Sequence, residues 1–232
     1  MNRFRFFLLV MLIPVLSFVL SSCDNDDDMV YISSVPNAIV TVKPNSDNTS
    51  FVLQLTDNKI LVPQNMKSSP FGNKEVRAFV NYTRLSTGMS DMNVRINWID
   101  SILTKPTYSI RDFRDNPDFA TDPVEILDSW EMGTEDGYLT IRFRTRWNPG
   151  SKHAVNLVLR DDINHDGPIL QFSHKADGDT YTGVAGDGVV AFRLPDYFNE
   201  GGEPFKIILM WKSYTGERTR EFTYFQRKDT AD

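Results

Sequence analysis

A run of oxygen-bearing side chains in the second half of the chain has the spacing of a calcium loop. Asp162, Asn164 and Asp166 alternate along the chain, and Gly167 follows them. Carboxylate and amide oxygens on alternate residues can wrap a hard cation, and glycine permits the sharp turn. The position that should carry a bidentate glutamate is Ser173, between strand-like flanks. We therefore predict either a calcium site or a polar hairpin loop whose side chains bond their own backbone.

Arginines form a second candidate site. Arg142, Arg144 and Arg146 alternate with apolar residues, so they lie on one face of a predicted strand. Such a stripe can bind an anionic ligand or an acidic partner protein. The alternative is a solvated face whose arginines pair with acids on a neighbouring strand.

The usual catalytic and metal-binding motifs are missing from the sequence. No two of His153, His165 and His174 have the H-x-x-x-H spacing of a helical zinc site, so we expect exposed or capping histidines. Neither G-x-S-x-G nor G-x-G-x-x-G occurs. The 31 acidic residues always offer carboxylate pairs for a glycoside hydrolase. We predict that the chain is not an enzyme, with a hydrolase as an alternative.

Aromatic residues offer a platform for sugar or protein, or else belong to the core. They are Trp147, Tyr197, Phe198, Trp211, Tyr214 and Tyr224.

Cys23 is the only cysteine, and it follows a basic start and an apolar stretch over residues 6–20. This is the pattern of a secretory signal. The stretch is shorter than the roughly 20 residues that a membrane-spanning helix needs, and Pro14 interrupts it. Residues 20–23, Leu-Ser-Ser-Cys, resemble the bacterial lipobox, in which cleavage precedes the cysteine and its sulfur receives a diacylglycerol. We predict a covalent lipid, including palmitate, on Cys23; an ordinary cleaved signal is the alternative.

Residues 24–28 are polar and hold four aspartates, so they predict a solvated tether after the anchor. An acidic patch in this place resembles an export signal for the outer leaflet of the outer membrane. We predict a cell-surface position, with a periplasm-facing lipoprotein as the alternative.

The net charge and the single cysteine limit which ligands the chain can bind and which covalent bonds it can form. Without residues 1–22 the chain has 23 basic and 31 acidic side chains, because Arg3 and Arg5 are removed, and its net charge is −8. An acidic chain is poorly suited to non-specific nucleic-acid binding, which depends on phosphate neutralisation. With its one thiol acylated, the chain forms no disulfide.

The elements that must position these residues are nearly all strands, because apolar residues alternate with period two. In the first half we expect strands over residues 38–43, 51–56, 59–62, 75–82 and 92–104, with a tight turn at Asp57-Asn58. Five short strands of this spacing predict a small barrel of the OB type or a compact sandwich. A charged, proline-bearing link should follow over residues 105–123, with one helical turn near 110–114.

The second half predicts an antiparallel β-sandwich. We expect strands over residues 124–131, 137–147, 153–160, 168–174, 188–194, 205–214 and 218–227. The predicted organisation is all-β: a signal peptide (1–22), a lipidated tether (23–35), an OB-like barrel (36–120) and a β-sandwich (121–232).

Together these features resemble the NigD-like lipoproteins. The resemblance rests on the lipobox with its acidic tail, the two-part all-β layout, the stretch over residues 136–143 (Asp-Gly-Tyr-Leu-Thr-Ile-Arg-Phe) and the aromatic-rich last strands. It implies an N-terminal OB-like domain and a C-terminal β-sandwich, but no catalytic or ligand residues. The family's association with a bacteriocin cluster implies a role in self-protection.

We therefore expect a membrane-anchored envelope lipoprotein that binds a protein or peptide partner in bacteriocin immunity. The alternative is a glycan-binding accessory lipoprotein of a polysaccharide-uptake system. An OB-like barrel often binds oligosaccharides, but a fold alone does not assign a function.

Overall fold

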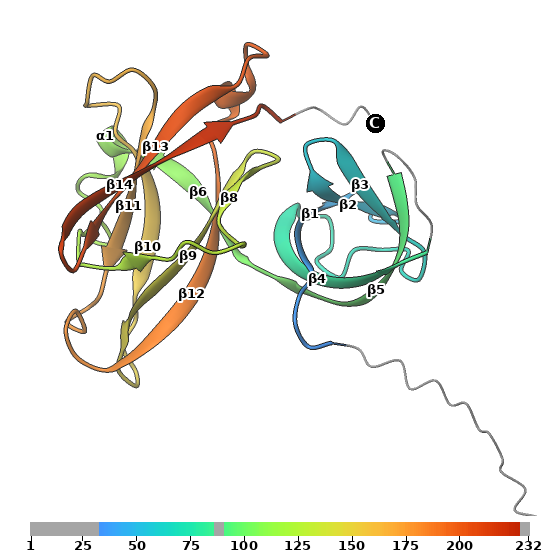
Figure 1. The fold of residues 1–232 in the computed structure, drawn as a ribbon, viewed down its shortest axis with the longest axis horizontal. Helices are drawn as coiled ribbons and strands as arrows, with labels where there is room; N and C mark the ends of the chain where they lie inside the picture. Colours follow the sequence, from blue (N-terminus) through green and yellow to red (C-terminus); the bar gives the residue numbers. More distant parts are fainter. Residues whose placement is uncertain (1–32, 86–90, 228–232) are drawn as a thin grey trace, which may run out of the picture. The chain divides into compact units, whose positions relative to one another are not determined.

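The computed structural model describes residues 33–85 and 91–227 (Figure 1). Cys23, most of the acidic tether and the signal segment lie outside these ranges. The described ranges contain no helix of the length and apolar character needed to cross a membrane.

The first five strands close into a barrel. Their bounds are β1 Ala38–Pro44, β2 Phe51–Thr56, β3 Lys59–Pro63, β4 Val76–Arg84 and β5 Asp91–Ser101. They pair in the order β1-β2-β3-β5-β4, and β4 pairs with β1 to close the circle. The β3–β5 pair is parallel and the others are antiparallel. This closed five-stranded barrel is the predicted OB architecture.

Alternation along the strands produces the barrel core, because every second side chain points inward. Val40, Leu53, Leu61, Val80 and Val94 are fully buried in this core. The expected turn at residues 57–58 joins β2 to β3. An irregularity at residues 81–82 shifts the register between β4 and β5.

The remaining strands form one nine-stranded sheet that curls into a sandwich. Their bounds are β6 Leu103–Ser109, β7 Glu125–Ile126, β8 Gly133–Glu135, β9 Tyr138–Trp147, β10 Ala154–Leu159, β11 Ile169–Lys175, β12 Val184–Arg193, β13 Phe205–Ser213 and β14 Gly216–Tyr224. The order is β14-β13-β11-β10-β6-β12-β9-β7, and β8 pairs with β9. A helical turn, α1 (Ile110–Phe113), and a 3-10 turn, η1 (Asp196–Asn199), complete the described elements.

One core lies between the inner faces of the curled sheet. Phe143 on β9 and Phe192 on β12 both contact Phe172 on β11, with ring centroids 5.5 and 6.1 Å apart. Leu139, Ile141 and Leu157 are fully buried in it, so the face of β9 opposite the arginines points inward. Leu159 packs against the core but is only partly buried.

The segment after the barrel differs from the sequence expectation. Instead of one strand over residues 92–104 and an irregular link, β5 ends at Ser101 and β6 begins at Leu103. β6 runs parallel to both β10 and β12 and so joins the two halves of the sheet. Its side chains are exposed or half-buried, so it lacks the apolar alternation by which strands are recognised. The helical turn at residues 110–113 is confirmed.

Two further strands also differ from the prediction. The strand expected over residues 124–131 shrinks to the two residues of β7, and β8 forms a few residues later. β12 begins at Val184, four residues before the expected start. Its first residues include Gly186 and Gly188, which interrupt the apolar pattern there.

Candidate functional site

A tight turn carries the first residues of the candidate site. Asp136 and Gly137 join β8 to β9 with φ angles of 50° and 81°. Two consecutive positive φ values are typical of the Asp-Gly hairpin turn whose twist matches the strands on either side. The turn leaves Asp136 and Tyr138, both buried, against residues of the barrel.

The carboxylate of Glu75, just before β4, lies among three donors of the sandwich. Arg227 holds it with two bonds, Nη1 to Oε1 at 2.7 Å and Nη2 to Oε2 at 2.6 Å. The Tyr138 hydroxyl donates to Oε1 at 2.6 Å, and Arg193 Nη2 lies 3.4 Å from the same oxygen. This bidentate pair with an added hydroxyl is a strong geometry for a carboxylate. We call Tyr138, Arg193 and Arg227 the carboxylate cage.

The electrostatics of the cage follow from these contacts. Burial acts to raise the pKa of Glu75, but the hydrogen bonds from Arg227 and Tyr138 outweigh it and lower the pKa. Burial and the charge of Glu75 raise the pKa of Tyr138, so its hydroxyl stays a donor. The hydrogen bond to Glu75 raises the pKa of Arg227. Glu75 is therefore held as a carboxylate and Arg227 as a cation.

A second set of charges adjoins the cage. Lys43 Nζ lies 2.8 Å from Asp136 Oδ1; the Asp136 side chain is buried and that of Lys43 is 9% exposed. The Asp136 backbone N–H donates to Asp57 Oδ1 at 3.1 Å. Arg77 is 3% exposed, donates to Thr41 Oγ1, and lies 5.9 Å from the centre of the Tyr138 ring. Burial lowers the pKa of Arg77, which the nearby carboxylates of Glu135 and Asp136 oppose. Buried charges are retained in proteins when such partners surround them.

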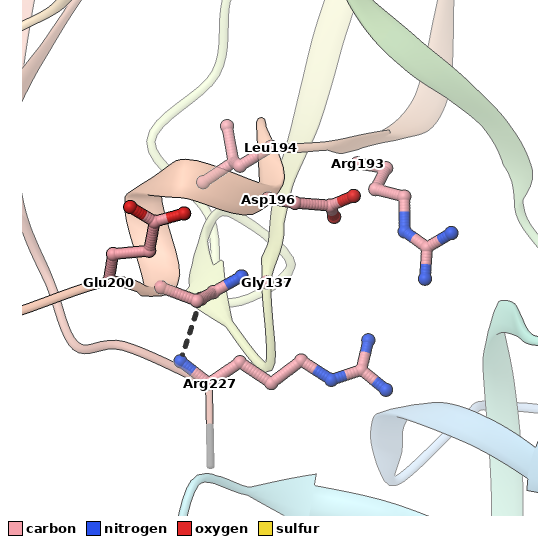
Figure 2. A pocket seen from close by; sticks show the side chains of 7 residues that line it. Gly137, Arg193, Leu194, Asp196, Glu200 and Arg227 are labelled. Carbon is pink, nitrogen blue, oxygen red and sulfur yellow. Dashed lines mark hydrogen bonds between the residues drawn. The ribbon is translucent and has the colours of Figure 1, made fainter. Parts of the chain in front are cut away.

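Beside the cage lies a cavity of about 420 Å³, lined partly by Gly137, Arg193, Asp196 and Arg227. Figure 2 shows the guanidinium groups of Arg193 and Arg227 extending to the same side, while Glu200 points away from them. The Arg193 side chain is 52% exposed, contacts Glu75 at 3.4 Å and has its Cζ 6.0 Å from the centre of the Tyr138 ring, so it retains N–H donors for another group. A Cβ on Gly137 would lie 3.3 Å from Arg227 Cδ, so glycine leaves room for that side chain.

The chemistry of this arrangement is recognition of a carboxylate. The cage donates hydrogen bonds from an always-charged guanidinium and a hydroxyl that keeps its proton, which suits binding better than proton transfer. Sequence reasoning missed these residues because Glu75, Arg193 and Arg227 are far apart in the chain. The one feature of the sequence that pointed to this site was the Asp-Gly turn directly before Tyr138.

The structure pairs the arginine stripe with acids. Arg142 and Arg144 both bind Asp187, which lies opposite Arg144 on β12, and Arg142 also contacts Glu131 at 2.9 Å. Hydrogen bonds from the two arginines lower the pKa of Asp187 to about 2. Arg146 donates to a backbone carbonyl. This arrangement matches the solvated-face alternative, and an anionic ligand at the stripe stays a prediction.

The candidate calcium residues lie in an exposed loop between β10 and β11. The Asp162 carboxylate accepts bonds from Arg160 at 2.8 Å and from Arg114 at 3.0 Å, which give it cationic partners of its own. Within residues 33–85 and 91–227, no group of three or more His, Cys, Asp or Glu side chains is placed to hold a metal ion. Calcium binding by Asp162, Asn164 and Asp166 stays a prediction.

The six aromatic residues do not form a common surface. Phe198, Trp211 and Tyr224 are buried in the core, and Trp147 packs against it. Tyr197, 54% exposed, is the one with a largely open ring. The core interpretation is therefore the better one for most of them.

The histidine expectation is wrong for two of the three. His165 is exposed, but the side chains of His153 and His174 are buried and in contact. The period-two pattern held the signal, since His174 follows Leu170 and Phe172 on the inward face of β11.

Comparisons with known proteins agree with both domains. The model of the NigD-like N-terminal OB domain matches residues 39–102, and that of the NigD-like C-terminal beta sandwich domain matches residues 109–224. None of the curated proteins matches the chain.

Several solved structures are similar. A protein of Parabacteroides distasonis described as toxin related is 31% identical, with 81% of this chain and 92% of that one covered and a TM-score of 0.62. A NigD-like immunity protein of Bacteroides caccae is 23% identical (84% and 99% covered, TM-score 0.58). A protein of Bacteroides fragilis described as a lipoprotein is 14% identical (82% and 98% covered, TM-score 0.58). The last two likenesses concern the fold alone.

Proposed function

Because the chain belongs to the NigD-like family through both of its domains, we propose that it is a non-enzymatic lipoprotein of the cell envelope that protects the cell by binding a bacteriocin. The anchor is the lipid on Cys23, and the acidic tether carries the two domains to the cell surface. One solved relative is named an immunity protein and another is described as toxin related, which supports this role.

The observation that carries the binding proposal is the polar cavity beside the carboxylate cage. Arg193 stands at its wall, half-exposed, with most of its donors available. Arginine is enriched among the residues that dominate protein–protein affinity. We place the partner's acidic side chain or terminal carboxylate against Arg193.

Glycan binding has less support. It would need aromatic rings open to solvent, and most of the candidate rings lie in or against the core. We therefore retain only the protein or peptide partner.

Competition between cells tests the role. A strain without the gene is mixed with its toxin-producing parent, and survivors of each are counted. The proposal expects the deleted strain to be depleted and the wild-type gene to restore it, whereas Cys23→Ala and Arg193→Ala genes should not. Arg218→Ala is the matched control, because Arg218 is an exposed arginine on β14, away from the cavity lining. Equal survival of the deleted strain in contact with the parent would argue against immunity.

A further inference from the structure

Three side chains form a line inside the sandwich, separate from the carboxylate cage. His153 Nδ1 lies 2.9 Å from His174 Nε2. At one end of the line, His153 Nε2 lies 3.3 Å from Asp179 Oδ2, and at the other, His174 Nδ1 lies 3.3 Å from the carbonyl oxygen of Asp122. The His153 side chain is 1% exposed and His174 is 0% exposed. All four ring nitrogens therefore face a protein partner.

The number of hydrogens on the four ring nitrogens of His153 and His174 determines the charge of the two rings. A carboxylate and a carbonyl only accept hydrogen bonds, so each of the two outer ring nitrogens must carry a hydrogen. The contact between the rings needs one hydrogen more. Two neutral imidazoles carry one hydrogen each, so three hydrogens imply one extra proton. Asp179 does not supply it, because hydrogen bonds from Ser151 and Asn148 lower the pKa of its carboxyl.

We propose that His153 and His174 form a buried imidazole–imidazolium pair that shares one positive charge and fastens the loop between β11 and β12. The charge is centred on His153, which faces the Asp179 carboxylate. The ring of Trp147 also lies against His153, with centroids 4.1 Å apart, and an aromatic face favours a cation. His174 is the neutral partner, and burial lowers its pKa.

The charged groups around the pair come from several elements. Asp179 lies in the loop after β11, and Asp122, before β7, accepts a hydrogen bond from the backbone N–H of Ala176. Lys105 on β6 donates to the Val155 carbonyl and to Asn156, beside the pair on β10. Among the residues that the structure describes, Asp179 is the one carboxylate in direct contact with a ring of the pair, so it favours the charged form.

The pair holds together segments that are far apart in sequence. Asn148, after β9, bonds Asp179 through both its backbone N–H and its amide, and residues 120–122 bond the backbone of His174. If the third proton leaves, two lone pairs face each other at one end of the line, and that contact is lost. The loop between β11 and β12, which carries the 72% exposed Tyr181, is then held by one hydrogen bond fewer. The loop is therefore held while the pair carries the third proton and loosens when that proton is lost.

Nitrogen NMR of the histidine rings in the wild-type protein tests the count directly, because protonated and bare ring nitrogens have different shifts. At about pH 6, the usual range of histidine titration, the proposal expects three protonated nitrogens in the His153–His174 pair and a bare His174 Nε2. Exposed His165 is the internal reference. Only two protonated nitrogens in the pair at that pH would overturn the proposal.

A variant tests the part played by Asp179. Asp179→Asn should remove the third proton at the same pH, while Asp177→Asn, an exposed neighbour in the same loop, should leave three. Amide exchange in residues 177–183, corrected for intrinsic rates, should rise in Asp179→Asn only. Retention of the third proton in Asp179→Asn would contradict the role given to Asp179.

Discussion

At the scale of single residues, Cys23 has the most specific predicted role, that of the lipidated anchor. Lipid chains contribute about 0.8 kcal/mol per buried CH₂, and two or more chains anchor a protein stably. Cys23→Ala should therefore move the protein from the membrane fraction to the soluble fraction, as blotting of separated envelopes would reveal. Cys23→Ala protein that still sediments with membranes would disprove the lipid anchor.

Glu75 is one of the residues that join barrel and sandwich, together with Lys43 and Asp57. Glu75→Gln keeps the shape but removes the charge that Arg227 binds, and hydrogen bonds to charged groups contribute about 2 kcal/mol. We expect the free energy of unfolding in urea to fall by about that amount. Glu203→Gln, at an exposed position, is the control and should change little.

The pH dependence of stability follows from the lowered pKa of Glu75. Its unfolded pKa is near 4.5, and the folded value is lower. The unfolded chain thus binds the proton more readily, so this contribution is present above pH 4.5 and is lost as the pH falls through the folded value. Wild-type stability should drop below that pH by more than Glu75→Gln stability does. If the free energy of unfolding had the same pH dependence in the wild type and in Glu75→Gln, the pairing of Glu75 with Arg227 would be contradicted.

At the scale of elements, the glycines of β12 show how closely the sandwich packs. A Cβ on Gly188 would lie 2.6 Å from Phe143 Cζ on β9, whereas one on Gly133 would meet nothing within 4 Å. Gly188→Ala should lower the free energy of unfolding by about 1–3 kcal/mol, as overpacked cores do. Gly133→Ala should leave it nearly unchanged. Equal urea midpoints for the two variants would show that the Phe143 ring moves aside without cost.

Elements with a regular apolar pattern could be predicted from the sequence, and those without one could not. Apolar residues alternate closely along β2 and β9, because Phe51 and Leu53 face the barrel core and Leu139, Ile141 and Phe143 face the sandwich core. β6 escaped prediction because its half-buried side chains carry no alternation, although it joins both halves of the sheet. The carboxylate cage could not be predicted from the sequence for another reason. Its residues meet only through the pairing of strands far apart in sequence, which a local pattern does not encode.

At the scale of the whole molecule, we propose that the protein is an anchored binding protein. In this proposal a lipid on Cys23 holds the protein and residues 24–28 form a solvated tether, while the barrel and the sandwich present the polar cavity. The net charge of −8 that remains without residues 1–22 contrasts with the half-exposed guanidinium group of Arg193, whereas Arg227 is already bound to Glu75. An acidic group of a partner would therefore be attracted to Arg193 at the cavity, whereas the net negative charge of the chain repels it elsewhere.

The most direct test of this account is calorimetric titration of purified residues 23–232 with the secreted toxin to which the deleted strain has become sensitive. We predict a dissociation constant below about 1 µM, weakened about tenfold or more by Arg193→Ala and unchanged by Arg218→Ala. Absence of binding, or equal affinity for both variants, would contradict the central claim that Arg193 at the polar cavity recognises the partner.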